Sequence, residues 1–385
     1  MKLKIIFLLS LVIVIFSIIY IVTLLNKDFV LTKEEEFKDT ITVWITTSGL
    51  VSALETYQRE SGTQMNIKQF NTMDLLIEEL ELSTKEDSMP DVVEINANYG
   101  GDEVLQKGKP IPLETFSNVQ LSSFLDSSIN NFMYKKTYYG FPLGVTIPVL
   151  LINRSILDHH LSTEMVVSPF TSEKNLGKFK KIQAKINENN RLKPFWMFHF
   201  DETIPYYWYA YKQSDQYNGA PFRELWHSII NDLKLVPSMD SHMAITRFTN
   251  MEIGALVTTS EKLQTIQELI GNGFEYEVVP LFPDKSPLLT TGNGFISFNS
   301  QKKIDQFYKF LNNEKTQIEI HSNTGWMPAK KSLMNDSGYI YKLPMSKFLN
   351  KLTLRQEDFI GRNIIDDSRQ NWIRIKEIAK KTEKE

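Results

Sequence analysis

The sequence predicts an α/β protein of two lobes, with mainly parallel sheets and a hinged cleft between the lobes. Strand-like and helix-like segments alternate over residues 40–100, as they do in the βαβ units that build parallel sheets. The chain has 385 residues, which is long enough for two domains. Two passages that contain Gly, Pro or Thr, residues 138–154 and 289–294, are suited to carry the chain from one lobe to the other.

Composition and charge exclude several classes of function. Hydrophobic residues make up 42% of the chain and charged residues 23%, which is typical of a globular protein. The formal net charge is -3, so no basic patch for nucleic acid is indicated and no nucleic-acid partner is expected. The absence of cysteine excludes thiolate catalysis, disulfides and cysteine-based zinc sites.

The N-terminal segment, residues 5–25, is apolar at nearly every position and is long enough to span a bilayer as one transmembrane helix. Lys2 and Lys4 place the N-terminus in the cytoplasm, so the main domain is expected to be extracellular at the cell membrane. Bulky side chains stand where a signal peptide needs small residues for cleavage, which favours an uncleaved anchor over a signal peptide. Residues 26–39 are predicted to be a charged spacer.

The first part of the body predicts two loops where a ligand would bind. Strands are predicted at residues 40–45, 65–70 and 92–95, and helices after residue 49 and at residues 74–82. Ligands of parallel sheets bind beyond the carboxyl ends of the strands. The candidate residues there are Trp44 and Thr46 after the first strand and Asn96 after the third, with a core position as the alternative for Trp44.

Residues 138–154 predict the first crossing between the lobes. The run from Val149 to Ile152 is apolar throughout and suits a strand buried on both faces. Pro148 cannot donate a ladder hydrogen bond, so it is expected at the start of that strand. Thr146 precedes it as a candidate ligand donor, and residues 289–294 predict the second crossing.

The second part of the body contains a dense aromatic block at residues 195–211. Most of these rings are expected to fill the core, and either Trp196 or Trp208 is a candidate platform for the apolar face of a sugar. Further on, Trp326 lies in a Gly- and Pro-containing loop where burial is difficult, so ligand contact is expected. A helix is predicted at residues 302–311, and two or three helices at residues 340–381.

Catalytic and metal-binding patterns are not found in the sequence. The six histidines are scattered, with no His-x-x-x-His spacing, so no metal site is expected. No Gly-x-Ser-x-Gly, P-loop or Gly-x-Gly-x-x-Gly motif is present. No catalytic residue and no cofactor are therefore predicted, although a pair of glycosidase carboxylates is not excluded by composition.

Four segments, in this order and spacing, resemble a known family. They are residues 41–49 (ITVWITTSG), residues 90–95 (PDVVEI), residues 140–154 (GFPLGVTIPVLLINR) and residues 324–332 (TGWMPAKKS). Together they resemble the family 1 extracellular solute-binding proteins of ABC importers, with the sugar and glycerol-phosphate-ester binding group as the most similar. The resemblance extends from about residue 40 to about residue 375.

The resemblance implies a periplasmic-binding-protein-like fold of type II, a two-lobed α/β fold that closes on a ligand without chemistry. Lobe I is then expected at residues 40–146 plus 292–326, and lobe II at residues 147–291 plus 327–385 with the C-terminal helices. The residues that fall where such proteins contact ligand are Trp44, Thr46, Thr146, Gly292, Trp326 and Arg362. From the residues alone, Gly292 also suits a turn, and Arg362 suits an ion pair with Asp366 at helical spacing.

The sequence therefore predicts a membrane-tethered solute-binding protein that is not an enzyme. It would capture a saccharide or a polyol by lobe closure and deliver it to the permease subunits of an ABC importer. One alternative keeps the fold but couples it to a two-component signalling system. A third hypothesis is a surface glycosidase, which would need two specific carboxylates.

Overall fold

The computed structural model describes most of the chain from residue 40 onward. The described residues are 40–85, 88–158, 173–189, 194–201, 224, 226–237, 243–281, 288–343, 346–353, 359–361, 363–364 and 366–384. The predicted membrane segment and spacer lie outside them, as do Trp208 and Arg362. Among the described residues, no helix combines the length and the apolar character that crossing a membrane requires.

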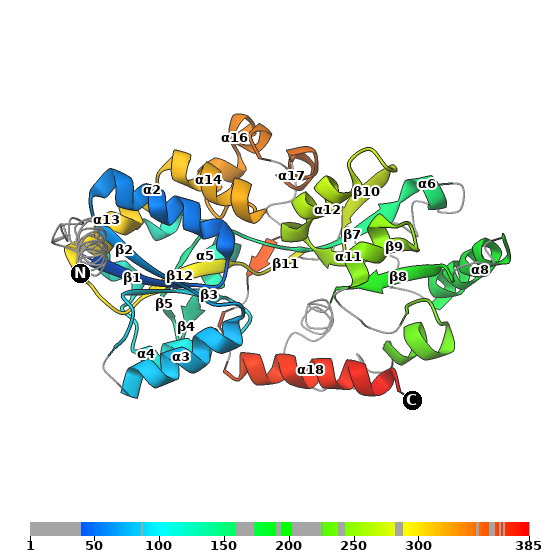
Figure 1. The fold of residues 1–385 in the computed structure, drawn as a ribbon, viewed down its shortest axis with the longest axis horizontal. Helices are drawn as coiled ribbons and strands as arrows, with labels where there is room; N and C mark the ends of the chain where they lie inside the picture. Colours follow the sequence, from blue (N-terminus) through cyan, green and yellow to red (C-terminus); the bar gives the residue numbers. More distant parts are fainter. Residues whose placement is uncertain are drawn as a thin grey trace, which may run out of the picture.

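Two lobes lie side by side and are joined by extended chain, which confirms the predicted two-lobe α/β fold (Figure 1). The first lobe contains a five-stranded sheet in the order β2-β1-β3-β12-β6. Its strands are β1 (Thr40–Ile45), β2 (Gln64–Gln69), β3 (Val92–Asn96), β6 (Gly140–Pro142) and β12 (Asn293–Ser297), with a separate hairpin of β4 (Met133–Tyr134) and β5 (Thr137–Tyr138). Its helices are η1 (Ser48–Leu50), α2 (Val51–Ser61), α3 (Met73–Lys85), α4 (Gly101–Gly108), η2 (Leu113–Thr115), η3 (Leu121–Ser123), α5 (Asp126–Asn130), α13 (Lys302–Leu311) and α14 (Glu314–Thr324).

The second lobe contains a four-stranded sheet in the order β10-β7-β9-β8. Its strands are β7 (Pro148–Asn153), β8 (Trp196–Phe200), β9 (Ile253–Thr259) and β10 (Tyr276–Pro280). Its helices are α6 (Arg154–Leu157), α8 (Glu173–Asn189), the π-helix η4 (Ser228–Asp232), α11 (Ala244–Thr249), η6 (Ser260–Lys262) and α12 (Leu263–Ile270). The two strands β11 (Leu288–Thr290) and β13 (Phe359–Gly361) pair in parallel near the junction of the lobes.

Hydrophobic patterning explains the elements that the sequence predicted. The apolar run in β7 is buried on both faces, and all six residues of the strand are buried. Helix α13 buries Ile304, Phe307, Tyr308 and Leu311, which lie on one face at helical spacing. Helix α2 ends at Gly62, whose φ of 71° gives the left-handed conformation that suits a helix C-terminus.

The expectation of mainly parallel sheets is wrong, because both sheets are mixed. In the first lobe β1 pairs in parallel with β2 and β3, but β12 is antiparallel to both β3 and β6. In the second lobe β7 is antiparallel to β9 and β10, and only β8 and β9 are parallel. The reason lies at the crossings. β7 and β12 each begin where the chain enters a lobe and run away from the junction, whereas β9 ends there, with Thr259 opposite Pro148.

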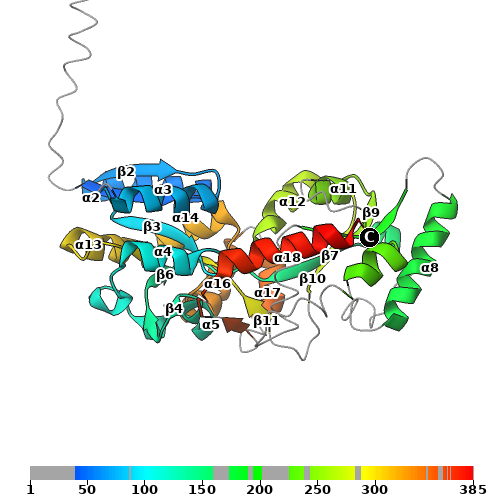
Figure 2. The same cartoon turned by 90° about the horizontal axis from the view of Figure 1, so that it is seen from below.

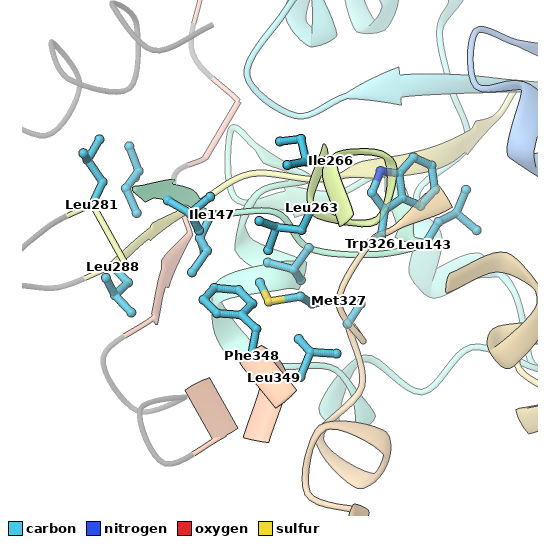
Figure 3. Close-up of a cluster of buried hydrophobic side chains, with 14 of the residues drawn as sticks. Leu143, Ile147, Leu263, Ile266, Leu281, Leu288, Trp326, Met327, Phe348 and Leu349 are labelled. Carbon is cyan, nitrogen blue, oxygen red and sulfur yellow. The ribbon is translucent and has the colours of Figure 1, made fainter. Parts of the chain in front are cut away.

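Three segments form the junction between the lobes. The main chains of Val145 and Met327 exchange two hydrogen bonds of 2.9 Å, and those of Thr146 and Thr291 exchange bonds of 2.8 and 3.0 Å. The third segment is the loop around Trp326, where the expected lobe boundaries, 292–326 and 327–385, already placed a passage from one lobe to the other. Ile147, Met327 and Leu263 lie in a buried apolar cluster around these segments (Figure 3).

The C-terminal helices do not all lie against one lobe. Helices α15 (Lys331–Met334), α16 (Ser337–Tyr341) and α17 (Ser346–Thr353) follow the third crossing. Helix α18 (Ser368–Thr382) then extends along both lobes (Figures 1 and 2). At its start the Ser368 hydroxyl donates to Asp102 on α4 at 2.7 Å, and at its end the Thr382 carbonyl accepts from Asn231 at 2.6 Å.

Candidate functional site

The carboxyl ends of β1 and β3 meet the start of β12 at one edge of the first sheet, next to the junction between the lobes. Asn96 and Asn293 are partners in the register of β3 and β12, and the Asn96 amide nitrogen donates to the Asn293 side-chain oxygen at 2.9 Å. The Ala97 N–H donates to the carbonyl of Gly292 at 3.0 Å. The structure therefore brings the predicted residues Thr46, Asn96 and Gly292 to one edge, which we call the lobe I edge.

Glu94 is a buried residue that accepts hydrogen bonds from groups of the lobe I edge, and it was not predicted from the sequence as a site residue. Its side chain is 0% exposed. One carboxylate oxygen accepts from the N–H groups of Thr46 and Thr47, at 2.7 and 2.9 Å. The other accepts from the Thr47 hydroxyl at 2.6 Å and from the Asn293 amide nitrogen at 2.5 Å. A charged residue in the apolar strand Val92–Asn96 is the signal that could have indicated it.

Trp44 contributes its main chain to this region, but its ring lies in the core of the first lobe. The residue is 4% exposed. Its ring lies 5.2 Å from that of Phe70, and the Lys68 amine lies 5.0 Å above it. The core position, which the sequence left open as the alternative to ligand stacking, is the one that this structure shows.

Thr146 and Trp326 lie at the junction itself. Thr146 is 3% exposed and Trp326 is 2% exposed, so neither offers much surface in this conformation. The Trp326 ring packs over Gly144, and its indole N–H donates to Glu261 at 3.3 Å, across the junction. Trp326 was expected to be difficult to bury in a loop, but the three adjacent crossings enclose it.

The second lobe presents the carboxyl ends of β8 and β9 at the same junction. The Thr258 hydroxyl donates to Asp201 at 2.9 Å, and the Ser260 N–H donates to the carbonyl of Ile147 at 2.8 Å. Sequence reasoning missed Asp201 and Thr258, which follow no recognisable motif. Trp196 begins β8 and so lies at the opposite end of this strand from Asp201.

The described part of the chain contains no group of three or more metal-ligating side chains close enough to hold an ion. At the lobe I edge the half-exposed groups are amides and hydroxyls, and Ser48 is exposed beside them. Such groups act as hydrogen-bond donors and acceptors. The arrangement therefore suits reversible binding of a polar, uncharged ligand.

His321 is a buried histidine that links α14 to the first crossing. Its Nε2 lies 2.9 Å from the carbonyl of Leu143, and its Nδ1 lies 2.6 Å from the Tyr339 hydroxyl. Since a carbonyl only accepts, Nε2 carries the proton and Nδ1 accepts from tyrosine. Burial lowers the pKa of His321 from 6.5 to about 4.

This burial predicts a loss of stability in acid. The folded state resists protonation at His321, whereas the unfolded state does not. The contribution of neutral His321 to the free energy of unfolding is therefore complete above pH 6.5 and is lost as the pH falls toward about 4. At 1.36 kcal/mol per pKa unit the loss amounts to about 3 kcal/mol. Urea unfolding between pH 7.5 and 4 measures it, and His321→Asn is expected to reduce the pH dependence by that amount. An unaltered pH profile in the His321→Asn variant would contradict the assignment.

Comparison with known proteins bears on both the fold and the family. Three similar solved structures are the GacH receptor of Streptomyces glaucescens, solved unliganded and with acarbose, Lmo0181 of Listeria monocytogenes with cycloalternan, and the sugar-binding protein MalE of Xanthomonas citri. Their TM-scores are 0.70, 0.69 and 0.68, each at 14% identity. The matches cover 90% of this chain in each case, and 93%, 96% and 91% of the other chains. This likeness shows a shared fold.

A search of curated proteins finds no match. The family model "Bacterial extracellular solute-binding protein" matches residues 52–340, which is more than half of the chain. This family consists of binding proteins, so the prediction that the chain is not an enzyme is confirmed. The fold, the polar edge at the junction and the family match agree, and the chain belongs to the bacterial extracellular solute-binding protein family.

Proposed function

We propose that this protein captures a saccharide or a polyol outside the cell by closing its two lobes, and that it delivers the ligand to the permease subunits of an ABC importer. The observation that carries the proposal is the lobe I edge, where uncharged hydrogen-bonding groups meet at the junction of the two lobes. A sugar hydroxyl both donates and accepts, so it is matched by amides and hydroxyls more closely than by a charged cluster.

The solved structures of similar fold support an oligosaccharide as the ligand. Their ligands include acarbose, cycloalternan and maltotetraose. The family to which this chain belongs supports an extracellular main domain. Within the proposal, Thr46, Asn96 and Gly292 contact the ligand from the lobe I edge. Thr146 and Trp326 contact it when the lobes rearrange, and Trp208 and Arg362 complete the set, whereas the ring of Trp44 stays in the core.

Binding would act by a population shift between open and closed arrangements of the lobes. The three hydrogen-bonded crossings support this proposal, because rotation within a few residues there moves one lobe as a unit relative to the other. The proposed lobes are residues 40–146 plus 292–326 and residues 147–291 plus 327–385. Residues 5–25 would tether the protein to the membrane so that captured ligand stays near the importer.

Thermal unfolding of the full-length chain in detergent, with a panel of maltooligosaccharides, cyclic glucans and polyols, tests the proposal. A ligand at one hundred times its dissociation constant is expected to stabilise the folded state by about 2.7 kcal/mol. Asn96→Ala and Asn293→Ala should abolish the effect, because each removes donors and acceptors from the lobe I edge. Arg59→Ala, at the exposed end of α2, should retain it. If no saccharide or polyol raises the midpoint, the proposed function is wrong.

A further inference from the structure

Glu94 is unusual because it is a carboxylate without exposed surface in the middle of a sheet. Burying a charge is costly unless hydrogen bonds replace the lost water. Here the replacement comes from two main-chain N–H groups, one hydroxyl and one side-chain amide, at 2.5 to 2.9 Å. All four donors belong to Thr46, Thr47 and Asn293, which lie at the lobe I edge.

The carboxylate also sets the direction of the hydrogen bonds along the edge. With donors on both oxygens Glu94 can only accept, so Asn293 must turn its amide nitrogen toward it. The Asn293 side-chain oxygen then faces the amide nitrogen of Asn96, at 2.9 Å. The Asn96 side-chain oxygen in turn accepts from the N–H of Asn98 at 3.0 Å. One buried charge thereby determines which end of each amide is a donor.

We infer that Glu94 is a positioning residue for ligand binding, which acts through the half-exposed side chains of Thr47, Asn96 and Asn293. This inference rests on the proposed function. The Thr47 hydroxyl gives its proton to Glu94 and accepts from the Asn293 amide nitrogen at 3.4 Å, so one lone pair remains as an acceptor for a ligand. Asn96 retains a second N–H as a donor. Because these groups are held before the ligand arrives, little of the binding free energy is spent on ordering them.

The polarity of the network separates this role from simple packing. In Glu94→Gln the side chain keeps its size, but an NH₂ group replaces one of the two acceptor oxygens. This NH₂ group would face groups that themselves donate, so those donors would lose their acceptor. In Glu94→Asp the charge and the acceptor character remain, but the side chain is one methylene shorter. We therefore expect the dissociation constant for a saccharide to rise from wild type to the aspartate variant and further to the glutamine variant.

The experiment measures three properties of the full-length chain and its variants. Calorimetric titration with the saccharide that stabilises wild type most gives the dissociation constant, well below the unfolding midpoint of each variant. Hydrogen exchange over residues 40–50 reports on the N–H groups of Thr46 and Thr47, and thermal unfolding reports on stability. We expect Glu94→Gln to raise the dissociation constant at least tenfold and to accelerate exchange at Thr46 and Thr47. Glu319→Gln, which changes a carboxylate bonded to Ser52 on the same lobe, should alter neither.

The outcomes distinguish the inference from the proposed function. If Glu94→Gln lowers the midpoint and accelerates exchange while the dissociation constant stays at the wild-type value, Glu94 is only structural and the inference is overturned, although the protein still binds sugar. If wild type binds no saccharide or polyol, the proposed function fails first and the inference fails with it. If the glutamine variant does not fold, Glu94→Asp decides: an increased dissociation constant supports the inference, and an unchanged one overturns it.

Discussion

Trp326→Ala is expected to lower the free energy of unfolding by about 3–5 kcal/mol, the range found when a buried aromatic side chain is truncated. Trp326 is 2% exposed, and its ring packs over Gly144 on the first crossing. Truncation leaves a cavity between adjoining crossings and removes the indole N–H bond to Glu261 of the second lobe. Urea denaturation of the wild type and the variant measures the loss.

Trp326→Phe is the matched control, because it keeps an aromatic ring over Gly144 and removes the bond to Glu261. It should cost clearly less than the alanine substitution. If the free energy of unfolding of the alanine variant lay within about 1 kcal/mol of the wild-type value, the ring would not fill the junction. The ligand contact that the sequence predicts for Trp326 is a separate matter, which the dissociation constant of the folded phenylalanine variant tests.

Gly292→Ala is expected to destabilise the folded protein by about 3 kcal/mol, at the upper end of the overpacking range. A Cβ at Gly292 would lie 2.0 Å from the carbonyl oxygen of Gly144 and 3.1 Å from its carbon. These are main-chain atoms of the neighbouring crossing, which the paired Thr146 and Thr291 hold in place. Two crossings would have to separate to admit one methyl group, so the effect arises from steric overlap and not from backbone conformation.

Gly177→Ala supplies the control for this prediction. Gly177 lies inside α8, and a Cβ there would meet nothing within 4 Å. Alanine is favoured over glycine in a helix by up to about 1 kcal/mol, so this variant should be slightly more stable than wild type. Urea denaturation of both variants measures the difference. If the free energy of unfolding of Gly292→Ala lies within about 0.5 kcal/mol of the wild-type value, the crossings are not packed as closely as the structure shows.

Much of the fold could be predicted, because hydrophobic patterning is a local property. Strand β1 lies at the predicted residues 40–45, and the buried run before Arg154 became β7, with Pro148 at its start. The passage at residues 138–154 does cross between lobes, as does the passage at residues 289–294. Strand direction was not predictable in the same way, because it depends on the lobe from which the chain enters each sheet.

The candidate site could be predicted only in part. Thr46 and Asn96 were predicted because ligands bind beyond the ends of strands, and the structure brings both to one edge beside Gly292. Glu94 was missed because its role depends on Asn293, which lies 199 positions later in the chain. The exposure of Trp44 and Trp326 could not be predicted either, because a ring at a strand end or in a loop is buried or exposed according to what packs over it.

The sequence by itself determined the two-lobe α/β class, the main crossings and the family resemblance, since all three depend on residue types and their order along the chain. Only the tertiary structure decided that the sheets are mixed, that the ring of Trp326 is buried at the junction and that α18 extends along both lobes. It also decided that a buried carboxylate orients the polar edge of the first lobe. The physical reason is that burial and hydrogen-bond polarity arise between segments distant in sequence, and no local pattern specifies which of them will meet.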